Sequence, residues 1–289
     1  MKTRFFAFAA LALSLAACNK DNENLNDGPV AAQFIADIHK AVSTRVNSEG
    51  TGFTDGDCIG ITGAGFTNVP YKRENGKFVT DGTTIYFNDT ETQTFHAYYP
   101  YQSDGGTVTV STAADKQGTG IDFLFASGAT GNTHNPTVSF TGDHAFHHCM
   151  SLIKFTFKAG DGLSFNGIEP AGYTLEGLKH EGTFDTATGT TAVTAAVESP
   201  ITMQLGGATT SQVIILPQGV TTSLDLKVSF NGLDYTTTLP NPSKPEANQF
   251  SAGYAYTYNI TLNNKGITVE EPEITPWEPG NSNDVSITL

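Results

Sequence analysis

Residues 224–235, with the sequence LDLKVSFNGLDY, decide the class of fold. Over the first seven positions apolar and polar residues alternate strictly, which is the pattern of a β-strand that buries one face. Asn231 and Gly232 follow, and they are the residues that a tight type I′ hairpin turn requires. The stretch therefore predicts two antiparallel strands joined by a two-residue turn.

The same pattern recurs on both sides of this hairpin. Ile153, Phe155 and Phe157 alternate with polar residues, and Asn75 and Gly76 form a second turn signal between two short alternating runs. Further alternating runs lie at residues 95–99, 108–110, 213–216 and 254–262. Because no long amphipathic helix interrupts them, the sequence predicts an all-β protein.

The length of the chain predicts more than one domain. Residues 30–289 exceed the size of a typical domain, which is roughly 150 residues. Many short strands separated by turns, without helical spacers, favour sandwiches over a parallel α/β architecture. We therefore expect two stacked β-sandwich domains, residues 30–144 and residues 145–289, with a poorly marked boundary between them.

The N-terminus has the organisation of a bacterial export signal. Lys2 and Arg4 precede an apolar run over residues 5–15, which is too short to span a bilayer, and residues 15–18 are LAAC. This pattern predicts a lipoprotein signal peptide of residues 1–17 with lipid attached to Cys18. The polar residues 18–29 are expected to form a flexible tether. Lys20, Asp21 and Glu23 resemble the acidic export signal of some bacterial lipoproteins, and this resemblance implies export to the outer membrane and cell surface.

Composition narrows the classes of function. The formal net charge of −14 disfavours nucleic acids and anionic lipid headgroups as partners, because both attract positive proteins. The sequence contains no serine-nucleophile elbow, zinc-protease helix motif, phosphate loop or dinucleotide fingerprint. We therefore predict that the protein is not an enzyme, with no catalytic residues and no cofactor.

The most suggestive ligand cluster is residues 144–149, HAFHHC, which offers donors of the kind that zinc accepts. On a strand, however, His144 and His148 share a face while His147 points the other way, so the donors cannot converge without a bulge. A packed histidine cluster is the favoured interpretation, and no metal site is predicted.

Other residues allow two interpretations. Cys58 and Cys149 could form a disulfide in an oxidising envelope, although two separate buried thiols are the preferred alternative. Trp277 is interpreted as a core residue, with a sugar-stacking platform as the alternative. The glycine-rich residues 60–65 are interpreted as a loop between strands.

Several short stretches, in order along the chain, resemble the fimbrillin-like family of lipoprotein-derived type V pilins. They are residues 44–45 (TR), 56–61 (GDCIGI), 98–101 (YYPY), 147–155 (HHCMSLIKF), 215–218 (ILPQ), 250–256 (FSAGYAY), and 266–269 (GITV) before Pro276 and Trp277. The resemblance implies two transthyretin-like β-sandwich domains and a role as a pilus subunit in cell adhesion. It also implies proteolysis after an arginine, which removes the first strand.

Applied to this sequence, the resemblance predicts which residues are cut, which are released and which replace them. Cleavage between Arg45 and Val46 expels residues 19–45 together with the lipid, including the alternating Phe34, Ala36 and Ile38. A neighbouring subunit's residues 284–289 then fill the vacancy. These residues alternate in the same way, with Val285, Ile287 and Leu289 as the apolar positions.

The partners in this hypothesis are other pilin subunits, of the same or of a different kind, and the outer membrane through the lipid on Cys18. The competing interpretation is a monomeric surface lipoprotein that binds a glycan or host ligand through the loops of its sandwiches. A polymerised subunit sheds Cys18, whereas an anchored binding protein keeps it.

Overall fold

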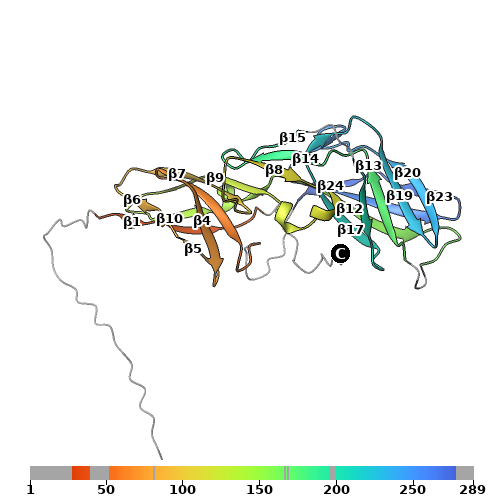
Figure 1. Cartoon of the computed structure of the whole chain (residues 1–289), viewed down its shortest axis with the longest axis horizontal. Helices are drawn as coiled ribbons and strands as arrows, with labels where there is room; N and C mark the ends of the chain where they lie inside the picture. Colours follow the sequence, from red (N-terminus) through yellow and green to blue (C-terminus); the bar gives the residue numbers. More distant parts are fainter. Residues whose placement is uncertain are drawn as a thin grey trace, which may run out of the picture.

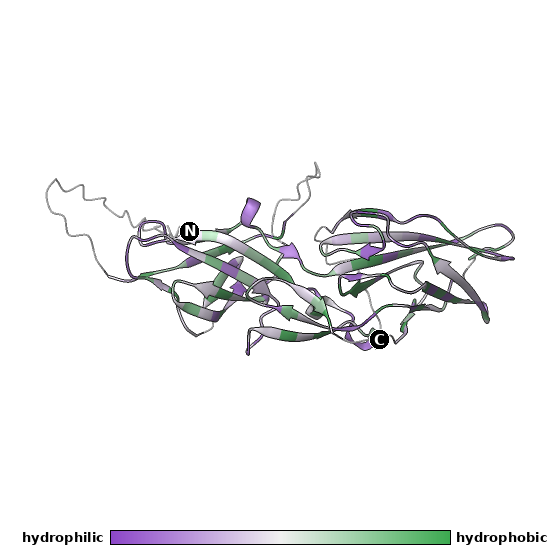
Figure 2. Ribbon diagram, turned by 90° about the horizontal axis from the view of Figure 1, so that it is seen from above, coloured by the Kyte–Doolittle hydropathy of each residue, from purple (hydrophilic) through white to green (hydrophobic). Residues whose placement is uncertain are grey.

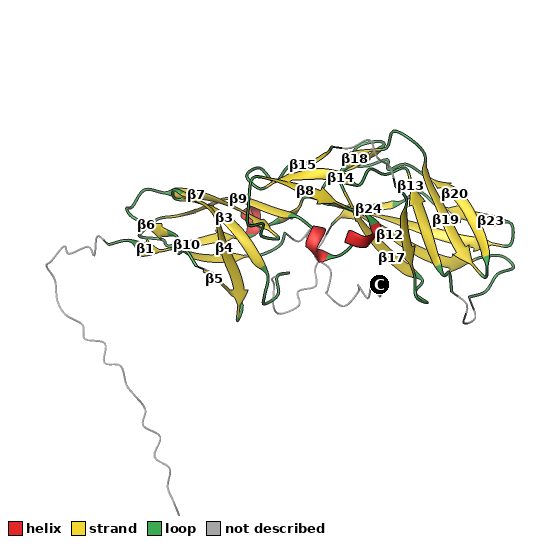
Figure 3. Cartoon of the chain, in the orientation of Figure 1, coloured by secondary structure: helices red, strands yellow, loops and turns green. Residues whose placement is uncertain are grey.

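The regular secondary structure of the described residues consists almost entirely of β-strands (Figure 1). The computed structural model describes residues 28–39, 52–80, 82–165, 167, 169–194 and 199–277. Within these ranges the helices are three short 3₁₀ segments, Ala114–Lys116, Thr119–Ile121 and Gly142–His144 (Figure 3). The all-β prediction is therefore confirmed.

An eight-stranded sheet forms the N-terminal part of the molecule. In spatial order its strands are β10 (Thr137–Phe140), β2 (Gln33–Ala36), β5 (Lys77–Thr80), β4 (Phe66–Glu74), β3 (Cys58–Gly63), β7 (Gln93–Tyr99), β9 (Leu124–Gly131) and β11 (His147–His148). A short strand, β1 (Val30–Ala31), precedes β2 and pairs with β6 (Tyr86–Phe87).

This sheet curls back on itself. Just beyond β2, Ile38 forms a parallel bridge with Phe146, the residue immediately before β11 at the other end of the sheet. The residues on the inner side are apolar and buried, and they form one continuous cluster. The alternation of apolar and polar residues along each strand favours this closure, because a curled sheet covers its own apolar face.

Two further sheets face each other in the C-terminal part. The first contains β17 (Thr210–Ile215), β12 (Ser151–Ala159), β22 (Tyr254–Asn263) and β23 (Gly266–Val269), with β24 (Glu273–Pro276) also paired to β22. The second contains β16 (Ile201–Gln204), β13 (Gly172–Glu176), β19 (Leu224–Phe230) and β20 (Leu233–Leu239). The ring centroids of Phe155 on β12 and Tyr173 on β13 are 5.0 Å apart, so the two inner faces interdigitate.

The N-terminal and C-terminal parts are joined by a small sheet that contains strands from both. β8 (Thr107–Ser111) from the N-terminal half pairs with β14 (Glu181–Asp185) from the C-terminal half, and β14 also pairs with β15 (Thr191–Val193). Beneath them a separate apolar cluster contains Phe123 and Phe184, whose rings stack at 4.5 Å. Trp277, predicted to be a core residue, packs against the edge of this cluster and is partly buried. A last two-stranded pair, β18 (Gln218–Gly219) with β21 (Gln249–Phe250), completes the fold.

Both predicted hairpins are present. Phe230 pairs with Leu233 and Glu74 pairs with Lys77, so each turn contains two residues. Both central residues of each turn have positive φ, which is the backbone conformation of a type I′ turn. Figure 2 shows apolar residues along the strands of both halves. The transthyretin-like topology and the boundary at residue 144 stay predictions.

The interpretation of residues 60–65 as a loop is wrong. Gly60 and Gly63 lie in β3, and the turn to β4 consists of Ala64 and Gly65. A side chain on Gly60 would overlap the ring of Tyr98, and one on Gly63 would overlap the ring of Phe95. The glycines are therefore present because large aromatic rings lie directly over this strand.

The packing of β2 generates a prediction about stability. Phe34 is 3% exposed whereas its neighbour Ile35 is 47% exposed, so the two residues form a matched pair on one strand. Phe34→Ala should destabilise the protein by about 3–5 kcal/mol, and Ile35→Ala by roughly 0.5 kcal/mol. Urea unfolding followed by circular dichroism measures both. Equal losses for the two variants would contradict the assignment of faces.

Candidate functional site, the slot of the first strand

Residues 30–38 are here called the first strand. Their central part, β2, is hydrogen-bonded to a neighbouring strand along each of its two edges. On one edge β2 runs parallel to β10, with Gln33 opposite Thr137 and Ala36 opposite Phe140. On the other edge it is antiparallel to β5, where Phe34 lies opposite Phe78. Removing the first strand would therefore leave two unpaired sheet edges facing each other, and we call the space between them the slot.

The backbone pairing continues past the end of β2. The Asp37 N–H donates to the carbonyl of Phe140 at 2.9 Å, and the His39 N–H donates to the carbonyl of Phe146 at 2.7 Å. The Phe146 N–H donates back to the carbonyl of Asp37 at 2.9 Å. One edge of the first strand is thus held first by β10 and then by the segment that leads into β11.

Phe34 occupies the centre of the slot. Its ring centroid lies 4.7 Å from that of Tyr71 and 5.7 Å from that of Phe95, both in edge-to-face geometry. The ring of Phe140 is stacked at 6.5 Å. Edge-to-face aromatic pairs contribute about 0.5–1.5 kcal/mol beyond the burial of their area. The space that holds one inward side chain of the first strand is here called a seat, and the seat of Phe34 is therefore shaped for an aromatic ring.

The space around the next two inward residues of the first strand, Ala36 and Ile38, differs from that around Phe34. Ala36 lies opposite Phe140, and both are almost fully buried, at 3% and 0% exposure. The Phe140 ring lies between those of Phe34 and Phe146, at centroid distances of 6.5 and 5.7 Å. Because paired residues of neighbouring strands project to the same face of a sheet, the small side chain of Ala36 leaves room on that face for the Phe140 ring. Ile38 follows, buried beside Phe146.

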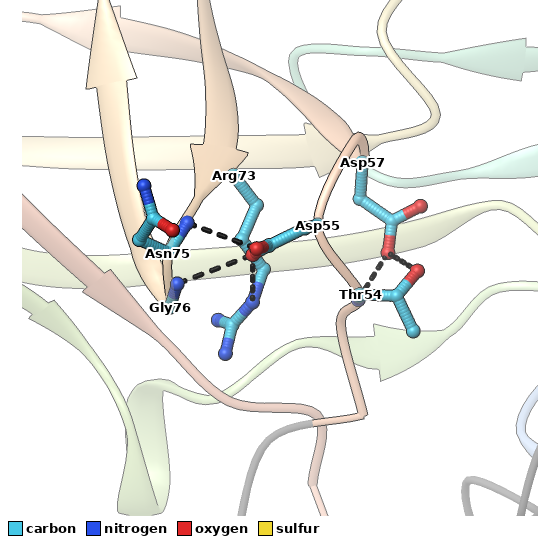
Figure 4. Close-up of polar contacts among 6 residues, drawn as sticks. All are labelled: Thr54, Asp55, Asp57, Arg73, Asn75 and Gly76. Carbon is cyan, nitrogen blue, oxygen red and sulfur yellow. Dashed lines mark hydrogen bonds and ion pairs between the residues drawn. The ribbon is translucent and has the colours of Figure 1, made fainter.

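A polar network fixes the chain shortly after the first strand (Figure 4). The carboxylate of Asp55 accepts hydrogen bonds from the backbone N–H groups of Asn75 and Gly76, at 2.9 and 3.1 Å, and lies 3.9 Å from Nε of Arg73. The Asp57 carboxylate accepts hydrogen bonds from Thr54. The segment of residues 54–57 is thus tied to the turn between β4 and β5, independently of the first strand.

The same segment is also attached on its other side. The phenol of Tyr99 donates a hydrogen bond to Asp57 Oδ1 at 3.0 Å, and burial followed by the charge of Asp57 raises the pKa of Tyr99. Phe53 is 4% exposed and packs edge-to-face on Phe78 and Phe146. The chain is therefore anchored from Phe53 onward.

The structure places the sequence-predicted residues of the first strand together. Phe34, Ala36 and Ile38 all point into the core of the N-terminal sheet. Cys18, Arg45 and Val46 lie outside the described residues, as do the proposed donor residues Val285, Ile287 and Leu289. Their roles stay predictions.

Sequence reasoning missed the partners of the first strand. Phe140 and Phe146 line the slot, and Asp55 holds the segment that follows it. The alternation of apolar Val138 and Phe140 with polar residues is a pattern that could have identified this segment as a strand. The parallel pairing of β10 with a strand about 100 residues earlier has no local signature, because such a contact depends on the whole topology.

Cys149 is a buried free thiol, while Cys58 lies half-buried on β3. Burial raises the pKa of Cys149 to about 12. The structure therefore gives the possible Cys58–Cys149 disulfide no support.

The histidine cluster is divided among separate partners. His144 Nδ1 is 3.0 Å from the carbonyl oxygen of Ser127, and His148 Nδ1 is 2.8 Å from Asp122 Oδ1. The His147 ring stacks on that of His39 at 4.6 Å. Among the described residues no group of three or more His, Cys, Asp or Glu side chains is arranged to hold a metal ion.

Comparison with known proteins agrees with this architecture. The family model described as fimbrillin-like matches residues 44–277. Fim1C of Bacteroides uniformis, named as a candidate fimbrium subunit, is 30% identical over 305 residues, an alignment that covers 97% of each chain. The chain therefore belongs to the fimbrillin-like family, a family of fimbrial subunits that act at the cell surface.

Two solved structures share the fold. A candidate cell adhesion protein of Bacteroides uniformis is 25% identical with a TM-score of 0.70, covering 87% of this chain and 100% of its own. Another, from Bacteroides ovatus, is 26% identical with a TM-score of 0.73, covering 87% of this chain and 99% of its own. In the described part of the present chain, no helix is long and apolar enough to cross a membrane.

The state of the cysteines can be tested by counting thiols. A chain that starts at residue 19 keeps two of the three cysteines, Cys58 and Cys149. At pH 8 Cys149 should not react with a thiol reagent in the folded protein, because it is buried and its pKa is raised. Both thiols should react in urea without reductant. Finding no thiols in urea would instead establish the disulfide.

The stack of His147 on His39 predicts a pH dependence. Burial, then the nearby His39 and His148, lower the pKa of His147 below its ordinary value of 6.5. The folded state then binds fewer protons than the unfolded state, so stability should fall as the pH drops through 6.5. His147→Gln should reduce the pH dependence of the urea midpoint between about pH 8 and 5, which brackets this titration. Part of the dependence should remain, because burial also lowers the pKa of His96. His134→Gln, at an exposed loop position, is the control and should keep the full dependence.

Proposed function

We propose that this chain is a structural subunit of a cell-surface fimbria, exported as a lipoprotein on Cys18 and assembled by exchange of its first strand. A protease cuts between Arg45 and Val46, and the segment that carries the lipid leaves with the first strand. The C-terminal strand of a neighbouring subunit, of the same or of a different kind, then enters the opened slot, as residues 284–289 of this chain do in a further subunit. The finding that supports this most directly is the position of the first strand, which is paired on both edges and buried at its centre.

The burial of the slot supplies the driving force for assembly. An open slot exposes the aromatic rings around Phe34 and two unpaired backbone edges. Apolar surface and unpaired backbone groups both favour a replacement strand over water. Main-chain hydrogen bonds provide the affinity in such strand addition, and the side-chain seats provide the selectivity. The same burial that completes the fold would therefore link one subunit to the next.

The anchor at Phe53 and Asp55 explains how the strand could leave without the rest of the sheet. The proposed cut at Arg45 lies between the first strand and this anchor. Once the chain is cut there, the first strand keeps only noncovalent contacts, while residues from Phe53 onward stay tied to β4 and β5. Cutting and release are thus separable steps.

The distribution of arginine supports the choice of the cut. The sequence contains three arginines, Arg4, Arg45 and Arg73, and Arg4 lies in the predicted signal peptide. The Arg73 side chain is 12% exposed, and its residue lies in β4 between two neighbouring strands. An arginine-specific protease acting on the folded mature chain is therefore expected to act at Arg45.

The competing function is an anchored monomer that binds a glycan or host ligand. One feature fits it, a polar hollow of about 390 Å³ on the outer face of the sheet formed by β13, β19 and β20. Thr174, Glu176, Lys227 and Thr236 are among the residues that line it. Such a protein must keep the first strand, because its lipid anchor is attached to the same segment.

Limited proteolysis tests the proposed cut and the exchange of the strand. An arginine-specific protease should cut the folded chain from residue 19 once, after Arg45, and residues 19–45 should stay bound until a surplus strand is supplied. A labelled peptide with the sequence of residues 28–39 should then replace the fragment, as measured by native mass spectrometry.

Arg45→Lys serves as the control for cleavage and should remain whole under the same conditions. Uncut Arg45→Lys protein should take up no peptide, because its first strand remains covalently joined. Uptake that is equal in cut and uncut protein would argue against strand replacement, and cleavage at Arg73 before Arg45 would argue against the processing site.

A further inference from the structure

The first strand presents four residues to the core, and their sizes alternate. Ala32, Phe34, Ala36 and Ile38 are all buried, at 7%, 3%, 3% and 7% exposure. The seats are therefore small, large, small and medium. The large seat is lined by aromatic rings, and the small seat at Ala36 is limited by the Phe140 ring opposite it.

The chain's own C-terminal residues do not match these seats. Val285, Ile287 and Leu289 are the apolar positions of the proposed donor strand, and none of them is aromatic. Aligned with Phe34, Ala36 and Ile38, the donor places Val in the aromatic seat and Ile in the seat of Ala36. Shifted by two residues, or reversed in direction, it still places a branched side chain in at least one alanine seat.

Both mismatches weaken binding. A side chain smaller than Phe leaves a cavity among the rings of Tyr71, Phe95 and Phe140, since close-packed walls collapse only partly. A branched side chain at position 36 would crowd Phe140, which lies opposite Ala36 on the neighbouring strand and is fully buried with its ring between two others. Phe140 borders both seats, so both mismatches act on the same buried ring.

From this mismatch we infer that the slot is specific for a donor strand with an aromatic residue next to an alanine-sized one on its inward face. Such a strand belongs to a different kind of subunit, and this chain's own residues 284–289 serve as donor to a slot of another shape. The inference rests on the proposed function. It adds that each copy of this chain accepts its donor strand from an unlike subunit, because self-pairing is poorly packed.

Grafts in the intact chain test the seats without any cleavage. One graft, Phe34→Val/Ala36→Ile/Ile38→Leu, and a second, Ala32→Val/Phe34→Ile/Ala36→Leu, give the first strand the inward residues of the C-terminal strand in two registers. Each should lower the folding equilibrium constant, measured by urea unfolding, by at least about 100-fold. The control Gln33→Ser/Ile35→Thr grafts only the outward residues and should change it less than about fivefold. A graft as stable as the parent would overturn the inference.

Peptide competition tests the same preference after cleavage, on the chain cut at Arg45. Three peptides of equal length are compared for their ability to replace residues 19–45. They are residues 28–39, residues 278–289, and residues 278–289 with Val285→Phe and Ile287→Ala.

The first and third peptides should act at concentrations at least about 100-fold lower than the second, a difference that corresponds to two tenfold steps in affinity. Restored replacement by the third peptide would show that the seats, and not other features of the C-terminal residues, set the preference. Equal replacement by the second peptide would overturn the inference while leaving the proposed function intact. If no peptide replaces the fragment, the proposed function fails, and the grafts alone decide the preference of the seats.

Discussion

The pairing of the first strand along both of its edges is the constraint on which the N-terminal half depends. β10 lies on one side of it and β5 on the other, and Ile38 bridges to Phe146 to close the curled sheet. A sheet completed by an interior strand at the chain terminus has one covalent connection to that strand and many noncovalent ones. This combination allows a strand to be essential for stability and still be replaceable, because backbone hydrogen bonds accept any extended chain.

The two halves lie end to end along the long axis of the molecule (Figure 1), and an apolar cluster at their junction lies between the cores of the two halves. β8 and β14 pair across it, and Phe123 stacks on Phe184 beneath them. The ring of Trp277 lies parallel to that of His148, with centroids 4.1 Å apart, and its backbone N–H donates to the carbonyl of Gly253. The last described residue is therefore held against a strand of the N-terminal sheet. An apolar junction of this kind resists bending between the halves, a property suited to a subunit of a fibre.

Local patterns predicted most of the strands, because period-two alternation and Asn–Gly turns depend only on residues that are close together in the sequence. The hairpins at Asn75 and Asn231 followed from such patterns, as did the lack of long helices in the part of the chain that the structure describes. The glycines of β3 led to a wrong loop prediction, since the sequence alone does not distinguish a glycine required by an overlying ring from a glycine in a loop. The alternation of Phe34, Ala36 and Ile38 predicted an inward face, yet the shape of the slot did not follow from it. That shape depends on Phe140 and Phe146, which reach the first strand through parallel pairing over a long separation in sequence.

The mass of the chain isolated from assembled fimbriae tests the central claim most directly. If the first strand is removed to open the slot, the subunit in the fibre begins at Val46 and carries no lipid. A subunit in the fibre that begins at a lipid-bearing Cys18 would contradict the account, because the first strand would then still fill its own slot.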